Sequence, residues 1–233
     1  MRKLLVGLAA AALAVPALAQ VSVGLRAAYA FPLGDALGGG AIGQSFKEKD
    51  LYRGVIPVQV EASWRITPRL SAGLYGSYGY GFKGKALQDF CDLPGASCPA
   101  PVDWRYGAQA AWSFGPQGPV EPWVGLGGGM RIAHFKVKNF TTLVPNPTPP
   151  PALVPFTGDL DGSLRGWELN VQGGADWRLL PQLVAGPYLQ AAVGQYRVQD
   201  ISYGSLGTVA GGAVDSPQTH GFITVGLRGQ FDL

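Results

Sequence analysis

The sequence has few charges, few histidines and cysteines, and a single long apolar run, which is confined to its first residues. Charged residues make up 14% of the 233 residues, and the formal net charge is +3. No stretch concentrates lysine and arginine, so the chain lacks the basic patch that a nucleic-acid partner would need. After the N-terminal run, no apolar segment approaches the roughly twenty residues of a transmembrane helix, which leaves a closed barrel as the other way to cross a membrane.

The two cysteines and two histidines limit the chemistry available to the chain. Cys91 and Cys98 flank a short segment that contains proline and glycine, and in an exported protein this spacing predicts a loop disulfide. Neither histidine lies near this pair in the sequence, which disfavours zinc. Because phosphate loops and redox motifs are also missing from the sequence, we predict neither a cofactor nor a metal.

Residues 1–19 have the three parts of a secretory signal peptide. Arg2 and Lys3 form the positive part, Leu4–Val15 is apolar but too short to span a bilayer as a helix, and Ala17-Leu18-Ala19 fits a cleavage site. We therefore divide the chain into a signal peptide, 1–19, and one domain, 20–233. Without Arg2 and Lys3 the mature chain is nearly neutral, so its charge says little about partners.

Glycine and aromatic residues are abundant, and they occur in segments where apolar residues alternate with small or polar ones. The chain has 35 glycines, 19 prolines and 11% aromatic residues. Alternation with a period of two predicts strands that have one apolar face. Eight segments of about ten residues show it, and they predict strands over 21–31, 55–66, 70–82, 103–114, 122–135, 166–178, 183–197 and 221–233.

The linkers between these segments alternate in length. Short linkers lie near 67–69, 115–121 and 179–182, and long ones cover 32–54, 83–102, 136–165 and 198–220. Short periplasmic turns and long extracellular loops are typical of outer-membrane barrels. The predicted fold is therefore all-β: a closed, eight-stranded, antiparallel, up-and-down transmembrane barrel. Ten strands remain possible if a long linker contains a hairpin, but the prolines within 136–165 favour an extended surface loop there.

The polar faces of the predicted strands carry charges at compatible heights. The interior of an eight-stranded barrel is just wide enough for side chains to fill, and charges held there need partners. The competing interpretation is a soluble sheet whose charges face water. We predict an ion-pair network in the lumen, formed by Arg26, Glu61, Arg65, Arg105, Arg131, Glu168, Asp176, Arg178, Arg228 and Asp232.

The tryptophans all lie at the ends of predicted strands, whereas strand middles hold valine, leucine, alanine and glycine. Amphipathic rings at both strand ends predict two belts at the height of the lipid headgroups. A soluble core would scatter such rings through the strand middles. The predicted belts contain Trp64, Trp104, Trp112, Trp123, Trp167 and Trp177.

The pattern resembles the superfamily of small bacterial outer-membrane β-barrels that includes the OmpA-type and OmpW-type barrels. The last strand resembles the signal read by the barrel-assembly machinery, with alternating hydrophobic residues and Leu233 in place of the usual terminal phenylalanine. This resemblance implies that the assembly machinery and outer-membrane lipid are partners of the chain, and we expect a monomer. The residues of this assembly signal are Val225, Leu227, Phe231 and Leu233.

We expect a non-enzymatic protein of the outer membrane, with a filled lumen and surface-exposed loops that act in envelope structure or surface interaction; the ligand of the loops is not predicted. The first alternative is a narrow, porin-like channel, for which glycines such as Gly79 and Gly127 could leave room. A lipid A-modifying enzyme is a further alternative, because His134 and His220 both map to strand ends on the extracellular side. However, His134 lacks the serine two residues later that deacylase-type barrels have, and Asp215 and Ser216, the polar residues before His220, lie in a loop. The last alternative is a soluble periplasmic barrel that binds an apolar ligand.

Overall fold

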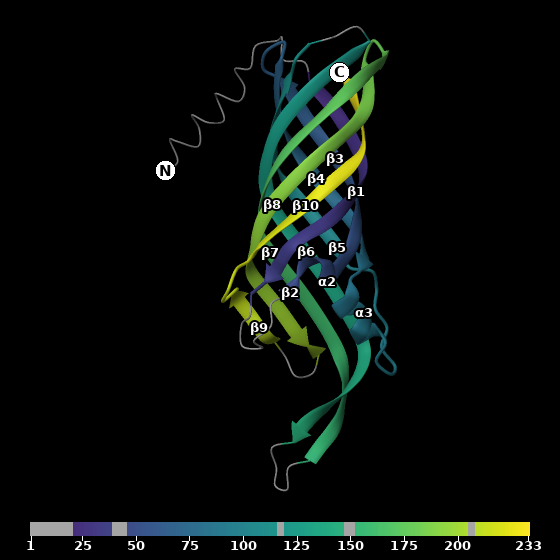
Figure 1. The fold of residues 1–233 in the computed structure, drawn as a ribbon, viewed down its shortest axis with the longest axis vertical. Helices are drawn as coiled ribbons and strands as arrows, with labels where there is room; N and C mark the ends of the chain where they lie inside the picture. The colour runs from purple at the N-terminus through teal and green to yellow at the C-terminus, as the bar shows by residue number, and fades with distance from the viewer. Residues whose placement is uncertain (1–20, 39–45, 116–118, 147–151, 205–207) are drawn as a thin grey trace.

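The computed structural model describes residues 21–38, 46–115, 119–146, 152–204 and 208–233 (Figure 1). The predicted signal peptide, 1–19, lies outside these residues and stays a prediction. No helix in the described ranges is long and apolar enough to span a membrane.

Eight antiparallel strands form a closed ring, as the sequence predicts. The last strand pairs with the first strand and also with the strand before it in the ring, which closes the barrel. At the turn end of the barrel, the ends of the ring strands lie within a few residues of the predicted ends. The agreement is good there because the apolar alternation stops at the turns. The ring consists of β1 (Val21–Leu37), β3 (Tyr52–Arg65), β4 (Leu70–Lys83), β5 (Val102–Ser113), β6 (Val120–Asn146), β7 (Ala152–Leu180), β8 (Leu183–Tyr203) and β10 (Thr219–Asp232).

The long linkers contain additional short elements at one end of the barrel. They are β2 (Phe46–Lys47), α2 (Glu48–Leu51), α3 (Lys85–Cys91) and β9 (Thr208–Ala213). β2 pairs with β1, and β9 pairs with β8, so neither joins the ring. In Figure 1 these elements gather at the lower, loop end, whereas the C-terminus and the short turns lie at the upper end.

The prediction of an extended surface loop over 136–165, without strand pairing, is wrong for its described part. β6 and β7 stay paired from the barrel out to Asn146 and Ala152, and Figure 1 shows them as a twisted ribbon that projects beyond the barrel. Pro145 and Pro155 take part in the register. A two-stranded ribbon has two free edges, so a proline there does not have to donate to another strand.

The barrel wall has apolar side chains on its outer face and charged side chains inside, which is the reverse of a soluble protein. Leu126 and Leu227 are 67% and 66% exposed on the outer face, whereas Arg26 and Arg131 are 1% exposed inside. An apolar outer band around a charged interior is stable only where hydrocarbon surrounds the wall. The chain is therefore built as an outer-membrane barrel, with its turn end in the periplasm and its loop end outside.

The outward faces of the last strand carry the predicted assembly signal. Val225, Leu227, Phe231 and Leu233 are all exposed. Three of them lie within β10, and Leu233 follows it, where its N–H bonds Val21. Their alternation thus points toward lipid, and recognition by the assembly machinery remains a prediction.

Candidate functional site

Two clusters of buried charge occupy the lumen, and each is built on two arginines that face each other on neighbouring strands. Arg26 on β1 is the register partner of Arg228 on β10, and Arg105 on β5 is the partner of Arg131 on β6. Like charges directly opposite on one face of a sheet are destabilising. Both pairs therefore depend on carboxylates from other positions in the ring.

The first cluster joins Arg26 and Arg228 to two carboxylates. Nη2 of Arg26 lies 2.6 Å from Oε2 of Glu61, and its Nη1 donates to Gln172. Nη2 of Arg228 lies 3.1 Å from Oδ2 of Asp176. The paired side chains are at most 9% exposed. Each cation thus has its own carboxylate, which offsets the cost of holding two guanidinium groups together away from water.

The second cluster lies closer to the loop end and shares its carboxylates. Arg131 reaches Asp103 at 2.8 Å through Nε and Glu168 at 3.0 Å through Nη1. Arg105 lies 3.6 Å and 3.5 Å from the same two residues. The Phe222 ring lies over the Arg131 guanidinium, 3.5 Å from its carbon to the ring centroid. Two cations and two anions alternate, so the cluster is neutral overall.

The turn end of the predicted network is looser, and one member does not belong to it. Arg65 lies 3.3 Å from Asp232, with 39% of the Arg65 side chain exposed. Arg178 is 55% exposed, lies 3.7 Å from Glu121 and donates to the Pro181 carbonyl. The prediction that Arg178 lines the lumen is therefore wrong. Its strand becomes irregular after this residue, so the long side chain reaches water at the rim.

The prediction that Trp123 belongs to an aromatic belt is also wrong. Trp123 is 4% exposed inside the barrel, and the Arg228 guanidinium lies 4.2 Å from its ring centroid. Gly174 of β7 leaves room for the indole, since a methyl group there would lie 2.9 Å from the ring. The side-chain alternation with Val124 was the signal that could have found this position. Trp167 is half-buried on the outer face, and the other tryptophans are exposed there: Trp64, Trp104, Trp112 and Trp177.

The helix α2 carries a carboxyl group into the loop end of the barrel. Glu48 is fully buried, its Oε1 accepts a 3.0 Å hydrogen bond from the Tyr196 hydroxyl, and its Oε2 has no partner among the described residues. Burial raises the pKa of Glu48 from 4.5 to about 7, although the Arg131 charge and the Tyr196 bond oppose this rise. The arginines of the second cluster already have Asp103 and Glu168, so this extra acid is held in its neutral form below that pH.

Apolar residues around α2 form a buried cluster with the ring strands at this end. Leu51 and Tyr52 pack with Leu164, Tyr196 and Phe222 in one buried cluster. His220 stacks on Tyr196 at 4.2 Å between ring centroids and is 1% exposed. Sequence reasoning placed Glu48 and Tyr52 in an extracellular loop and missed their part in the lumen, because no strand periodicity marks them.

Two of the lumen glycines, Gly79 and Gly127, face side chains of other strands. A methyl group on Gly79 would lie 2.6 Å from Val55 and 3.1 Å from Asp103, and one on Gly127 would lie 2.9 Å from Asn170. The space over these glycines is thus filled by side chains from other strands. A small hollow of about 60 Å³ opens at the turn end, beside Arg65 and Trp123.

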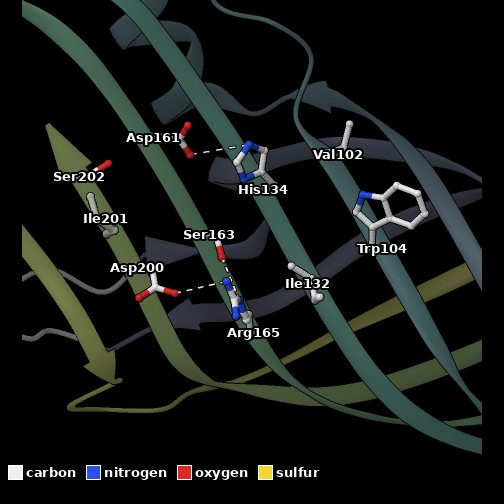
Figure 2. A pocket seen from close by; sticks show the side chains of 10 residues that line it. All are labelled: Val102, Trp104, Ile132, His134, Asp161, Ser163, Arg165, Asp200, Ile201 and Ser202. Atoms are coloured by element: carbon white, nitrogen blue, oxygen red, sulfur yellow. Dashed lines mark hydrogen bonds and ion pairs between the residues drawn. The ribbon is translucent and has the colours of Figure 1, made fainter. Parts of the chain in front are cut away.

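The two histidines lie on opposite sides of the barrel wall, so they cannot share a catalytic site. His134 faces outward into a surface hollow of about 470 Å³ (Figure 2), where its Nε2 lies 3.7 Å from Asp161. Ser163 is the register partner of His134, but its hydroxyl accepts from Arg165 Nε at 3.3 Å. No hydrogen bond joins Ser163 to His134 in the described structure. A serine nucleophile activated by histidine is therefore not assembled here.

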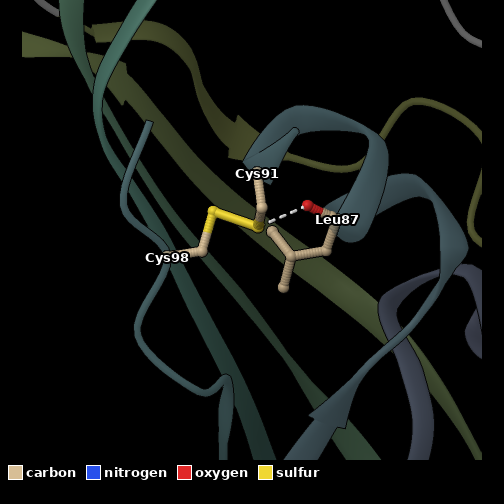
Figure 3. Close-up of a disulfide and its surroundings, with 3 residues drawn as sticks. All are labelled: Leu87, Cys91 and Cys98. Atoms are coloured by element: carbon tan, nitrogen blue, oxygen red, sulfur yellow. Dashed lines mark hydrogen bonds between the residues drawn. A yellow bond between two sulfur atoms is a disulfide. The ribbon is translucent and has the colours of Figure 1, made fainter. Parts of the chain in front are cut away.

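Outside the membrane band, a second core supports the projecting ribbon. Leu87, Val137, Phe140 and Leu160 are buried together, and Cys91 and Cys98 pack against them. The two cysteines form a disulfide, and the Cys91 sulfur also lies 2.8 Å from the Leu87 carbonyl (Figure 3). Ser97 and Lys138 form a β-bridge that ties the disulfide loop to β6. This core gives the ribbon a defined base.

Comparison with known proteins gives structural likeness only. No family model and no curated protein matches the sequence. A major outer membrane protein from Thermus thermophilus is 14% identical, with a TM-score of 0.49 over 91% of this chain and 99% of that one. Neisserial surface protein A is 15% identical, with a TM-score of 0.46 over 89% and 95%. The outer membrane protease OmpT from Escherichia coli is 8% identical, with a TM-score of 0.40 over 92% and 97%.

Proposed function

We propose that this chain is a non-enzymatic, monomeric barrel with a non-conducting lumen, which acts through the assembly at its extracellular end. The single observation that carries this proposal is the distribution of side chains. The lumen holds mutually paired charges under a docked helix, whereas the loop end has its own core and a projecting ribbon. Binding functions concentrate on such segments when a rigid scaffold supports them. Envelope structure and surface interaction both fit this arrangement.

A planar-bilayer recording tests the closed lumen. The purified barrel should give no discrete conductance steps, because both charge clusters lie across the axis. A variant that removes the α2 carboxyl, Glu48→Ala, should also stay silent, since the charge clusters remain. Reproducible single-channel steps from the unchanged chain would instead establish the narrow channel.

Mass spectrometry of lipid A tests the enzymatic alternative. Cells that produce His134→Ala or His220→Ala should have the same lipid A as cells that produce the unchanged chain. The reason is that His220 is sealed inside the barrel and His134 lacks a bonded serine. A change in acylation that depends on either histidine would contradict the non-enzymatic proposal.

A further inference from the structure

We infer that a basic hollow at the loop end binds the phosphate groups of outer-leaflet lipid headgroups. The hollow, of about 480 Å³, lies between α2, the end of β4 and α3. Its cations are Lys49, Arg53, Lys83 and Lys85. Two acidic residues of the α3 region, Asp89 and Asp92, also line it, so its net charge is +2.

The cations of the basic hollow differ from the arginines of the two lumen clusters and of the outer-wall hollow because they are unpaired. None of the four forms an ion pair with a carboxylate anywhere in the described ranges. The outer-wall hollow at His134 provides the contrast, since it is similar in size but its cations are neutralised. Arg165 lines that hollow and lies 3.5 Å from Asp200, and its neighbour Lys136 lies 3.0 Å from the lining residue Asp161. Like charges gathered without partners raise the local potential and attract anions.

The basic hollow is held together by a close contact between two segments. The N–H of Gly84 bonds the Leu51 carbonyl at 2.9 Å, and this bond joins the end of β4 to the end of α2. A methyl group on Gly84 would lie 2.4 Å from the Asp50 carbonyl atoms. Only glycine allows this approach, which brings Lys49 on one segment beside Lys83 and Lys85 on the other. The cations are thus positioned by the backbone, unlike charges scattered along a loop.

The height of the basic hollow identifies the source of the anion. Lys83 directly follows Phe82, and Arg53 precedes Ile56 by three residues. Phe82 and Ile56 are 39% and 41% exposed on the lipid-facing wall. At about 3.3 Å per residue, both cations therefore lie within about 10 Å of the apolar band. Headgroup phosphates occupy this layer, whereas a soluble polyanion would have to enter it from outside.

The binding test uses nanodiscs that contain lipid A either with or without its phosphates. Native mass spectrometry counts the lipid that stays on the barrel after mild release. The unchanged chain should retain phosphorylated lipid A and lose the dephosphorylated form. One cation near a lipid surface changes affinity about fivefold. Replacing all four cations by glutamine should therefore reduce retention at least twentyfold.

The matched control removes two cations that already have carboxylate partners. A chain with Lys136→Gln and Arg165→Gln should retain phosphorylated lipid A like the unchanged chain, since its carboxylates already occupied those cations. Heat-dependent gel mobility should show that both variants are closed barrels. Equal retention by the fourfold variant and the unchanged chain overturns the inference.

A second arm separates the lipid from a soluble anion. In neutral detergent, neither a heparin fragment nor inorganic phosphate should bind the unchanged chain saturably through these cations. The unchanged chain and the fourfold variant should therefore give the same result. Binding of the heparin fragment that depends on these four cations, without retention of phosphorylated lipid A, would show that the occupant is a soluble polyanion and overturn the assignment. Neither arm depends on whether the lumen conducts, so the outcome stands apart from the proposed function.

Discussion

Raising the pH should loosen α2 from the loop end of the barrel, and Glu48 is the reason. Its carboxyl has a pKa of about 7 when docked and 4.5 when exposed. Below pH 4.5 both states carry the proton, so the full stability of docking is present. Between pH 4.5 and about 7, the undocked carboxyl ionises while the docked one keeps its proton. The docking free energy is therefore lost as pH rises through about 7. The difference corresponds to roughly 3 kcal/mol.

Several charged and titratable groups face this carboxyl, and they define the control. Tyr196 on β8 bonds it, Arg131 on β6 attracts it, and Asp103 on β5 and Glu168 on β7 repel its ionised form. Glu48→Gln keeps an acceptor for Tyr196 but cannot ionise. Docking of α2 in this variant should therefore depend little on pH.

Hydrogen exchange measures the effect directly. The peptide over 47–53 should lose protection between pH 5 and pH 8 in the unchanged chain, after correction for intrinsic exchange. The Glu48→Gln chain supplies that correction under the same conditions. Protection that rises with pH, or an identical decline in both chains, would refute the reasoning about this carboxyl.

Three further outcomes follow from the described contacts. Glu61→Ala leaves the Arg26 charge buried without its carboxylate, so the free energy of unfolding should fall by about 3–5 kcal/mol, measured as a lower urea midpoint in micelles; an unchanged midpoint would contradict the pairing. Replacing Cys91 and Cys98 by serine should reduce hydrogen-exchange protection in α3 and at Lys138 but leave the barrel midpoint unchanged, because the disulfide belongs to the outer core; loss of the whole barrel would show that this core supports the ring. Spin labels at Val60 and Val171 should report oxygen-rich hydrocarbon, and a water-exposed signal at both would overturn the orientation of the wall.

The barrel itself could be predicted because its signal repeats. Eight alternating segments determine which residues face lipid, and a single exception such as Trp123 does not disturb the count. The lumen pairs could be predicted only as a set. Strand parity places Arg26 and Glu61 on the same face. The pairing of Arg228 with Asp176 cannot be predicted in this way, because β10 and β7 are not neighbours in the ring and their side chains meet across the lumen. Asp103 has the same strand parity as Arg105, yet nothing in the sequence showed that it lies between two arginines.

The loop end could not be predicted from the same signals. The paired extension of β6 and β7 contains prolines, which normally interrupt strands. The small core around Phe140 supports this extension, and it joins residues from separate segments, so the local sequence does not reveal it. The position of Glu48 depends on α2 entering the barrel, which no periodicity marks. Local sequence therefore predicts the membrane-spanning wall, whereas tertiary contacts determine the extracellular part.

The facing arginines on β1 and β10 have a consequence for how the ring forms. These two strands are the most distant in the sequence, so their joint is made after the hairpins exist. Arg26 and Arg228 repel each other as they approach, unless Glu61 and Asp176 are already in place to pair with them. The repulsion between these two arginines should therefore disfavour closure of a sheet whose β3 and β7 strands have not yet brought Glu61 and Asp176 into register.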